Sequence, residues 1–197
     1  MNYKTLDKQN KELISILNKN EDLIKILKYL STLKIPNFYI AAGYIFQTIW
    51  NYYDNKPLNY NIKDIDIIYY DKKNLSKEYE KILEDKITEY FKSQNLNYTF
   101  DIHNEARMHL WKKENENKNI DYYENSEDAI NQWIATVQAI GVTLKRNNIK
   151  IYAPYGLSDI FTKTIRPIKH KNNSKELYDN KVISWKKRFN NLNIIEW

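Results

Sequence analysis

The stretch Asn61–Tyr70 reads Asn-Ile-Lys-Asp-Ile-Asp-Ile-Ile-Tyr-Tyr and decides the fold. Its β-branched and aromatic residues predict a strand from Ile62 to Tyr70. Side chains two residues apart on a strand face the same side, so Asp64 and Asp66 point together while the isoleucines between and after them point into the core. Two neighbouring carboxylates repel each other, and a bound cation relieves that repulsion. The pair therefore indicates a metal site, although surface strands also produce Asp-x-Asp by chance.

A strand–turn–helix unit precedes this stretch. Phe38–Ala42 is apolar and predicts a short buried strand, and apolar residues at helical spacing predict a helix over Gly43–Tyr53. The chain has only 3 Gly, and Gly43 stands at the turn, where glycine lets a ligand approach the backbone. The free N–H groups of the first helical turn favour a phosphate there. The alternative is that Gly43 only relieves a tight turn.

A third carboxylate follows on the next predicted strand, Tyr98–Ile102. Phe100 and Ile102 should face the core, which leaves Asp101 on the opposite side. An unpaired buried charge is expensive, so an aspartate on an otherwise apolar strand needs a partner. Three acidic groups on adjacent strands, beside a glycine turn at a helix start, are typical of a two-metal phosphoryl-transfer centre.

The remaining elements complete a single α+β domain with helical ends. We divide the chain into N-terminal helices (1–35), a sheet core (36–155) and a basic helical segment (156–197). The predicted elements are two amphipathic helices within Leu6–Leu33, a helix over Leu75–Phe91, a strand over Arg107–Trp111, a mobile loop over Lys112–Asn125, a helix from Ser126 to Trp133 capped by Ser126, a hairpin of Ala135–Leu144 with Ile149–Tyr152, and helices over Gly156–Thr164 and Ser174–Arg188.

Composition narrows the class further. The 197 residues contain no Cys, which excludes disulfides, thiolate nucleophiles and cysteine zinc sites. No stretch approaches the roughly 20 apolar residues that span a bilayer, so we expect a cytoplasmic protein without a membrane partner. The net charge of +6 arises in Lys163–Trp197, which has 9 basic and 3 acidic residues. This segment either contacts the phosphates of a nucleotide or nucleic acid, or forms a solvated helix face.

The order of these motifs resembles a family of small bacterial nucleotidyltransferase-like proteins. The resemblance runs from about Asn37 to Trp197 and is carried by Ala41–Asn51, Asp64–Asp66, Asp101–Trp111, Ala135-Thr136, Ala139–Val142, Tyr152–Asp159 and Arg166-Pro167. That family is similar to the polymerase-beta-type nucleotidyltransferases, which implies a nucleotidyltransferase fold with a mixed β-sheet flanked by helices. The resemblance also implies that Asp64 and Asp66 bind Mg²⁺ or Mn²⁺ and that Asp101 is the third carboxylate.

The chain departs from that family at three positions. The chain has Tyr44 where the superfamily usually has a phosphate-binding Ser or a Gly, and Phe46 and Gln47 where many members carry Arg. The candidate nucleotide-binding residues are Gly43, Tyr44, Gln47, Asn104, Arg107 and His109.

The last three of these candidates follow the third carboxylate. Arg107 and His109 alternate on their predicted strand, where Arg107 would hold a phosphate and His109 a hydroxyl, or Arg107 would instead pair with an aspartate. The amide of Asn104 suits a base edge, whereas His103 is expected to be an ordinary surface or core residue. Four aromatic residues either stack a base or belong to the core: Trp111, Trp133, Tyr152 and Tyr155.

The leading hypothesis is therefore a magnesium-dependent nucleotidyltransferase. It would move a nucleoside monophosphate from an NTP to an unidentified hydroxyl acceptor, which could be RNA, a protein side chain or a small molecule, and release pyrophosphate. The alternatives are a non-catalytic nucleotide- or RNA-binding module on the same fold, and an interaction protein of a two-component pair.

Overall fold

Two amphipathic helices open the part of the chain that the structure, a computed structural model, describes, namely residues 5–197. They are α1 (Leu6–Leu17) and α2 (Glu21–Thr32), which confirms the predicted pair and the break between them. Asn20 causes the break because its side chain caps α2 by accepting a hydrogen bond from the backbone N–H of Leu23, at 3.1 Å.

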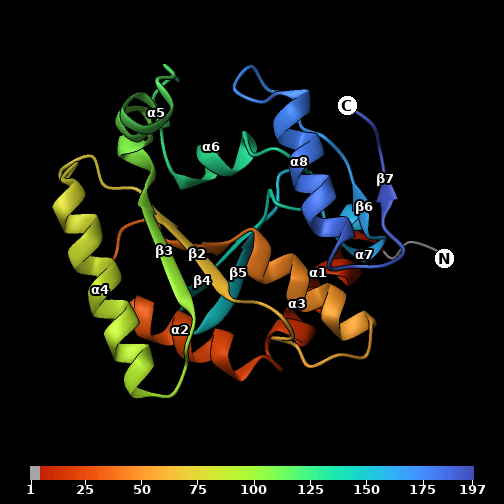
Figure 1. Ribbon diagram of the computed structural model, residues 1–197. Coiled ribbons are helices and arrows are strands. Elements are labelled where there is room, and N and C mark those ends of the chain that lie inside the picture. Colours follow the sequence, from red (N-terminus) through yellow and green to blue (C-terminus); the bar gives the residue numbers. More distant parts are fainter. Residues whose placement is uncertain (1–4) are drawn as a thin grey trace.

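A five-stranded mixed sheet forms the centre of the fold (Figure 1). Its order is β3-β2-β1-β4-β5, with β2 and β3 parallel and the other neighbours antiparallel. The strands are β1 (Tyr39–Ala41), β2 (Asp64–Tyr69), β3 (Thr99–Asn104), β4 (Gly141–Lys145) and β5 (Asn148–Tyr152). The parallel pair is joined by α4 (Lys77–Ser93), as a parallel pair requires a crossover. The predicted α+β domain with a mixed sheet flanked by helices is confirmed.

Strand alternation separates the two faces of this sheet. Ile65, Ile67 and Phe100 are buried in the main core with α2, α3 (Gly43–Tyr53) and α4, and each isoleucine stabilises the fold by about 1.5–3 kcal/mol. The opposite face, which carries Asp64, Asp66 and Ile68, holds only a small apolar cluster beside α6 (Ser126–Asn131). The sheet therefore leaves its aspartate face open for a site.

The predicted strand over Arg107–Trp111 is wrong. The segment forms a short 3₁₀ helix, η1 (Glu105–Arg107), followed by α5 (Met108–Glu116), which also occupies the first part of the predicted mobile loop. Ion pairs explain the helix, because Lys112 contacts Glu116 at the favourable i, i+4 spacing, at 2.6 Å.

Three smaller boundaries also differ from the prediction. Asn125, not Ser126, caps α6, since the Ser126 hydroxyl is used to donate to the carbonyl of Asn37 at 2.7 Å. The hairpin strand begins at Gly141, because the chain before it turns to pair Ala135 with Pro167. The helix predicted over Gly156–Thr164 shortens to α7 (Ser158–Phe161) and is followed by β6 (Thr164–Ile165).

The C-terminal segment closes the fold beside the open face. The helix α8 (Lys175–Lys186) is capped by Ser174 and packs its buried Tyr178, Val182 and Trp185 against the core. In Figure 1 it stands across from α5, and the chain then ends with β7 (Asn193–Ile194), which pairs with β6.

Among residues 5–197, no helix has both the length and the apolar character needed to cross a membrane.

Candidate active site

The parallel register of β2 and β3 brings the two central aspartates together. Asp66 lies directly opposite Asp101, and on the other side Asp66 is paired with Ala41 at the end of β1. Neighbouring strands lie about 4.8 Å apart, so directly opposed side chains on one face are in reach of each other. Asp64 precedes them on the same face and is exposed. The structure thus places all three predicted carboxylates on the open face.

Electrostatics at this pair favour a cation. Burial raises the pKa of Asp66 to about 6, and the charge of Asp101 adds to the rise, while Lys181 and His103 oppose it. The side chain of Asp101 is 58% exposed, so it keeps its contact with solvent, and His103 Nε2 lies 3.8 Å from its Oδ1. The folded chain therefore holds Asp66 in a site that disfavours its charge.

The turn before α3 lies against these carboxylates. The positive φ of 50° falls on Ala42, which stands at the N-cap position and supplies no side-chain acceptor to the first helical turn. Gly43 is required for another reason. A Cβ there would lie 2.8 Å from Gln47 Nε2 and 4.0 Å from Asp66 Oδ2. The glycine thus keeps the space between the helix start and Asp66 free.

Gln47 is held above this turn by the C-terminal segment. Arg188 Nη2 donates to Gln47 Oε1 at 2.5 Å and to the carbonyl of Asn61 at 2.7 Å. Because its oxygen is engaged in this way, the amide nitrogen of Gln47 is the end that lies next to Gly43. This is a fixed donor beside the turn, on a side chain that is only 6% exposed.

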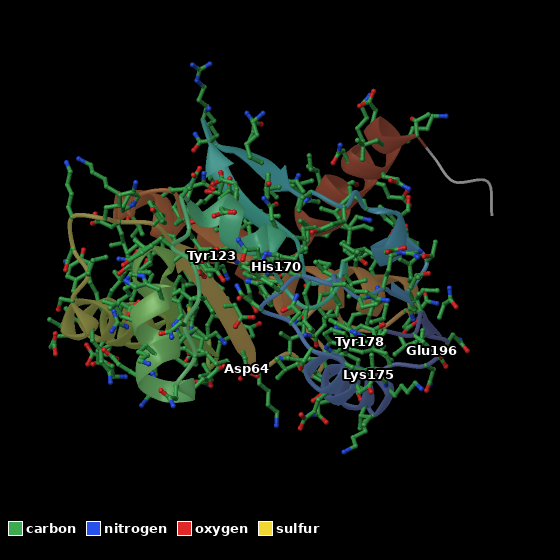
Figure 2. All side chains as sticks on the ribbon, turned by 90° about the horizontal axis from the view of Figure 1, so that it is seen from above. Asp64, Tyr123, His170, Lys175, Tyr178 and Glu196 are labelled. Carbon is green, nitrogen blue, oxygen red and sulfur yellow. The ribbon has the colours of Figure 1, made fainter. Side chains whose placement is uncertain are left out.

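A cleft of about 1070 Å³ opens over this face of the sheet. Its floor is made by Ala42, Asp66, Ile68 and His103. One wall comes from η1, α5 and the loop that follows, and the other from the segment after α6 and from α8. Figure 2 looks down on this arrangement, with Asp64 between α5 and α8 in the view and Tyr123 on the α5 side. The volume is that of a site for a ligand of cofactor size.

Among the lysines that line the cleft, Lys181 is the one without an ion-pair partner in residues 5–197. Lys112, Lys118 and Lys171 also line the cleft but are paired with Glu116, Glu116 and Asp121. Lys181, on α8, forms no ion pair with any residue in 5–197, and its charge acts on Asp66. Five other basic residues of the C-terminal segment are engaged by other side chains, namely Lys163, Arg166, Lys171, Lys175 and Arg188.

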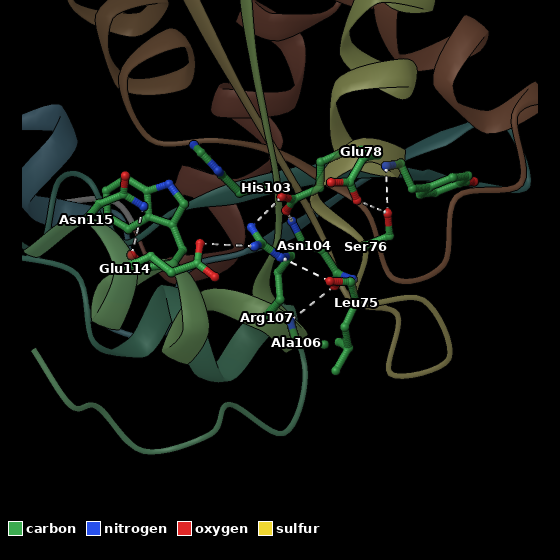
Figure 3. A network of polar contacts seen from close by, with 12 residues as sticks. Leu75, Ser76, Glu78, His103, Asn104, Ala106, Arg107, Glu114 and Asn115 are labelled. Carbon is green, nitrogen blue, oxygen red and sulfur yellow. Dashed lines mark hydrogen bonds and ion pairs between the residues drawn. The ribbon is translucent and has the colours of Figure 1, made fainter. Parts of the chain in front are cut away.

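Two of the predicted nucleotide-binding residues hold the fold instead (Figure 3). Arg107 is 3% exposed, and its Nη1 contacts Glu80 Oε2 at 2.8 Å, so it is a counter-ion of a glutamate rather than of an aspartate. Asn104 is fully buried, and its amide donates to the carbonyls of Asp71 and Asn74 at 2.9 and 2.8 Å. Both side chains tie the end of β3 to the segment that leads into α4.

Tyr44 and His109 also lie away from the cleft lining. Tyr44 is fully buried on α3, with its hydroxyl donating to Asn59 Oδ1 at 3.3 Å. The ring of His109 lies 4.2 Å from that of Tyr122, and burial lowers its pKa. His109 lies away from the cleft because its segment forms the helix α5 instead of the predicted strand, so strand alternation does not direct its side chain to the open face of the sheet.

Several residues of the cleft escaped the sequence analysis. Glu105, Gln138 and Lys181 line it, and we expected His103 to be an ordinary residue. Strand alternation could have found His103 and Glu105, which follow Asp101 at two-residue steps. Trp111 and Trp133, considered as base-stacking residues, do line the cleft, whereas Tyr152 donates to Asn131 Oδ1 at 2.7 Å.

Within residues 5–197, no three Asp, Glu or His side chains form a group that could hold a metal by itself. The donor chemistry still suits Mg²⁺, which in enzymes is usually bound through one or two carboxylates together with substrate phosphates. Asp66 and Asp101 supply such a pair, and a bound cation would relieve the repulsion between the two carboxylates.

Fold and site together define a nucleotidyltransferase-type domain. A family model described as "Nucleotidyltransferase" matches residues 28–194, and the chain belongs to that family. A solved structure described as revealing "a CCA-adding enzyme head domain" is 26% identical, with a TM-score of 0.80, over 95% of this chain and 96% of the other. No curated protein matches the chain.

Substituting Gly43 by Ala tests the role of the glycine. We expect the added methyl group to displace the Gln47 amide and to weaken NTP binding about tenfold. The free energy of unfolding should change little, because Gly43, the first residue of α3, has no positive φ that would strain Ala. Titration calorimetry and urea unfolding measure both quantities. An unchanged affinity would show that the space between Gly43 and Asp66 is not used by a ligand.

Proposed function

We propose that the protein is a divalent-metal-dependent nucleotidyltransferase that moves a nucleoside monophosphate from an NTP to a hydroxyl acceptor and releases pyrophosphate. The observation that carries the proposal is that Asp66, on the floor of the cleft and beside the start of α3, lies directly opposite Asp101 on the neighbouring strand. Membership in the nucleotidyltransferase family supports the reaction type.

Asp66 and Asp101 would hold the metal, with Asp64 next to them on the same face. The metal, when bound, supplies positive charge for the triphosphate and lowers the pKa of the attacking hydroxyl. Mg²⁺ and Mn²⁺ both accept oxygen ligands of this kind.

Hydrogen-bond donors near the start of α3 would bind the triphosphate in place of the serine that similar nucleotidyltransferases carry at the position of Tyr44. The first turn of α3 offers backbone N–H groups at the positive end of an 11-residue helix. The amide nitrogen of Gln47 lies beside that turn, and Lys181 brings a charge from α8. A helix end, an amide and an ammonium together form a phosphate site that does not need a serine at position 44.

The reaction then proceeds by in-line displacement. The acceptor oxygen forms a bond to the α-phosphorus while the bond between that phosphorus and the oxygen bridging to the β-phosphate breaks. The hydroxyl proton passes to a carboxylate, for which Asp101 is placed, and pyrophosphate leaves with the electron pair. The chain contributes mainly orientation and charge, which is typical of phosphoryl transfer.

RNA is the acceptor that we favour. The similar solved structure is described as revealing a CCA-adding enzyme head domain, which favours RNA over the other acceptors. The tip of the β4–β5 hairpin also carries Lys145, Arg146 and Lys150, side chains that suit a phosphate backbone.

Thermal unfolding with each of the four NTPs, with and without Mg²⁺, tests the proposal. A ligand at 100 times its Kd stabilises the fold by about 2.7 kcal/mol, so we expect at least one NTP to raise the Tm of the wild type only with Mg²⁺. Asp66→Asn/Asp101→Asn should abolish the shift, while Asp85→Asn, exposed on α4, should retain it. Transfer of α-labelled nucleotide to RNA then measures catalysis.

The outcomes distinguish an enzyme from a non-catalytic nucleotide-binding module. A magnesium-dependent shift with transfer of label supports the enzyme. A shift without any transfer to RNA, protein or small hydroxyl acceptors supports the nucleotide-binding module instead. If no NTP shifts the wild type, the proposal is overturned.

A further inference from the structure

We propose that Glu105 selects the nucleobase of the bound NTP by accepting a hydrogen bond from an exocyclic amino group. The inference rests on the proposed function, because it assigns the base end of the same cleft. It extends that function by naming the residue that distinguishes amino bases from their oxo counterparts.

The placement of Glu105 follows from strand alternation. Asp101, His103 and Glu105 succeed one another at two-residue steps from β3 into η1, and His103 and Glu105 both line the cleft. Four residues of extended chain separate Asp101 from Glu105 by roughly 13 Å. This separation allows a nucleotide whose phosphates lie at Asp66 and Asp101 to reach Glu105 with its base.

The carboxyl group of Glu105 lacks a partner inside the protein. The residue is only 3% exposed, yet its side chain accepts no hydrogen bond and forms no ion pair with any residue from 5 to 197. The neighbouring cation, Lys112, is held by Glu116 at 2.6 Å. Burial raises the pKa of Glu105 to about 8, with a further rise from Glu80 and an opposing effect of Lys112. Because Glu105 lines the cleft and has no partner inside the protein, its carboxyl group is available to a ligand there.

The surroundings fit a flat, largely apolar ligand. Met108, Trp111 and Tyr123 line the same wall of the cleft as Glu105, and Trp133 lines the opposite wall. Aromatic side chains of this kind stack on nucleobases. A carboxyl oxygen in such a pocket accepts from a base amino group, as it does when glutamate contacts the amino group of cytosine.

Above pH 8, where the carboxyl is ionised, it can only accept hydrogen bonds and therefore disfavours a base that presents a carbonyl oxygen there. CTP and UTP differ at this edge by an amino group against an oxo group, and ATP and ITP differ in the same way. The loss of one hydrogen bond, with an unsatisfied buried acceptor left behind, corresponds to about tenfold or more in affinity. We therefore expect CTP to bind at least about tenfold tighter than UTP, and ATP tighter than ITP by a similar factor.

Titration calorimetry of the full chain with Mg²⁺ and these four nucleotides tests the inference at pH 9, where the carboxyl of Glu105 is ionised. Glu105→Met, which is close in size and apolar, should bring the CTP/UTP and ATP/ITP affinity ratios to about 1 while magnesium-dependent binding persists. Glu89→Gln, an exposed glutamate on α4 outside the cleft, serves as the charge-matched control and should keep the wild-type ratios.

The possible failures are distinguishable. Equal affinities within both pairs in the wild type, or ratios that Glu105→Met leaves unchanged, would overturn the role of Glu105 while the proposed function stands. Absence of binding by every nucleotide would overturn the proposed function and this inference together. Equal affinities in the wild type overturn the role of Glu105 even if the variant does not fold.

Discussion

Asp66→Asn is expected to make the protein more stable while removing its activity. In the absence of divalent metal at pH 8, the free energy of unfolding should rise by roughly 2 kcal/mol. The reason is that burial and the charge of Asp101 raise the pKa of Asp66 to about 6, so the folded state resists the ionised form. The neutral amide has the same shape and no such cost. Urea unfolding at several pH values measures the difference.

The pH dependence gives this prediction its sign. The pKa of Asp66 is about 6 in the folded chain and 3.8 in the unfolded chain, so between these values the folded state binds more protons. The contribution of Asp66 to stability therefore falls as the pH rises from about 4 to 6 and stays low above 6. The advantage of the Asn variant should be largest above pH 6 and disappear near pH 4.

Asp64→Asn is the matched control, since Asp64 is exposed two residues earlier on the same strand. Its free energy of unfolding should change by less than about 0.5 kcal/mol. A lower stability of Asp66→Asn at pH 8 would mean that Asp66 is well stabilised as an anion, and the argument for a cation at this pair would fail.

Added Mg²⁺ and NTP should reverse the order of stability. The wild type gains binding free energy because Asp66 and Asp101 would both bind the metal, whereas Asp66→Asn lacks one of these two carboxylates. A site that destabilises the empty fold and is stabilised by its ligand is typical of catalytic centres.

The carboxylates were predictable because strand periodicity is a local property. Asp64, Asp66 and Asp101 alternate with buried apolar residues on their strands, so their common face follows from the pattern. The same alternation extends to His103 and Glu105, but the prediction turned instead to Asn104, whose side chain points to the opposite side and is buried.

The remainder of the site depends on contacts that are distant in sequence. Lys181 reaches the cleft from α8, and Arg188 holds Gln47 across 141 positions of the chain. Charge counting identified the basic segment but could not show which lysine lacks a partner. Gly43 was noticed, but its reason is a close approach of Gln47 rather than a positive φ, and only packing reveals that.

Arg107→Met is expected to cost about 3–5 kcal/mol of the free energy of unfolding. The side chains of Arg107 and Glu80 are 4% and 10% exposed and lie 2.8 Å apart, so removing the guanidinium leaves a buried carboxylate without its counter-ion. Arg107 Nε also donates to the carbonyl of Leu75 at 3.2 Å, which fixes the segment that leads into α4. Urea unfolding of the variant measures the loss.

A double-mutant cycle with Glu80 separates the pair from the other contacts of Arg107. Glu80→Met should be destabilising by itself, because Glu80 Oε1 also accepts from the backbone N–H of Asn104 at 2.5 Å. Arg107→Met/Glu80→Met should recover part of the sum, since it leaves neither charge buried alone. Arg107→Lys keeps the charge but loses the planar fork, and should fall between the wild type and Arg107→Met.

Nucleotide affinity decides between the structural role of Arg107 and the phosphate-binding role that its sequence position suggests. At a temperature where Arg107→Lys remains folded, its affinity for NTP with Mg²⁺ should stay within about twofold of the wild type, because Arg107 contacts Glu80 and Glu114 instead of lining the cleft. A loss of tenfold or more without a loss of stability would return Arg107 to the phosphate site. We expect Arg107→Lys to lose stability and to keep its affinity for NTP. This result would mean that the buried Arg107–Glu80 pair stabilises η1, the element from which Glu105 lines the cleft.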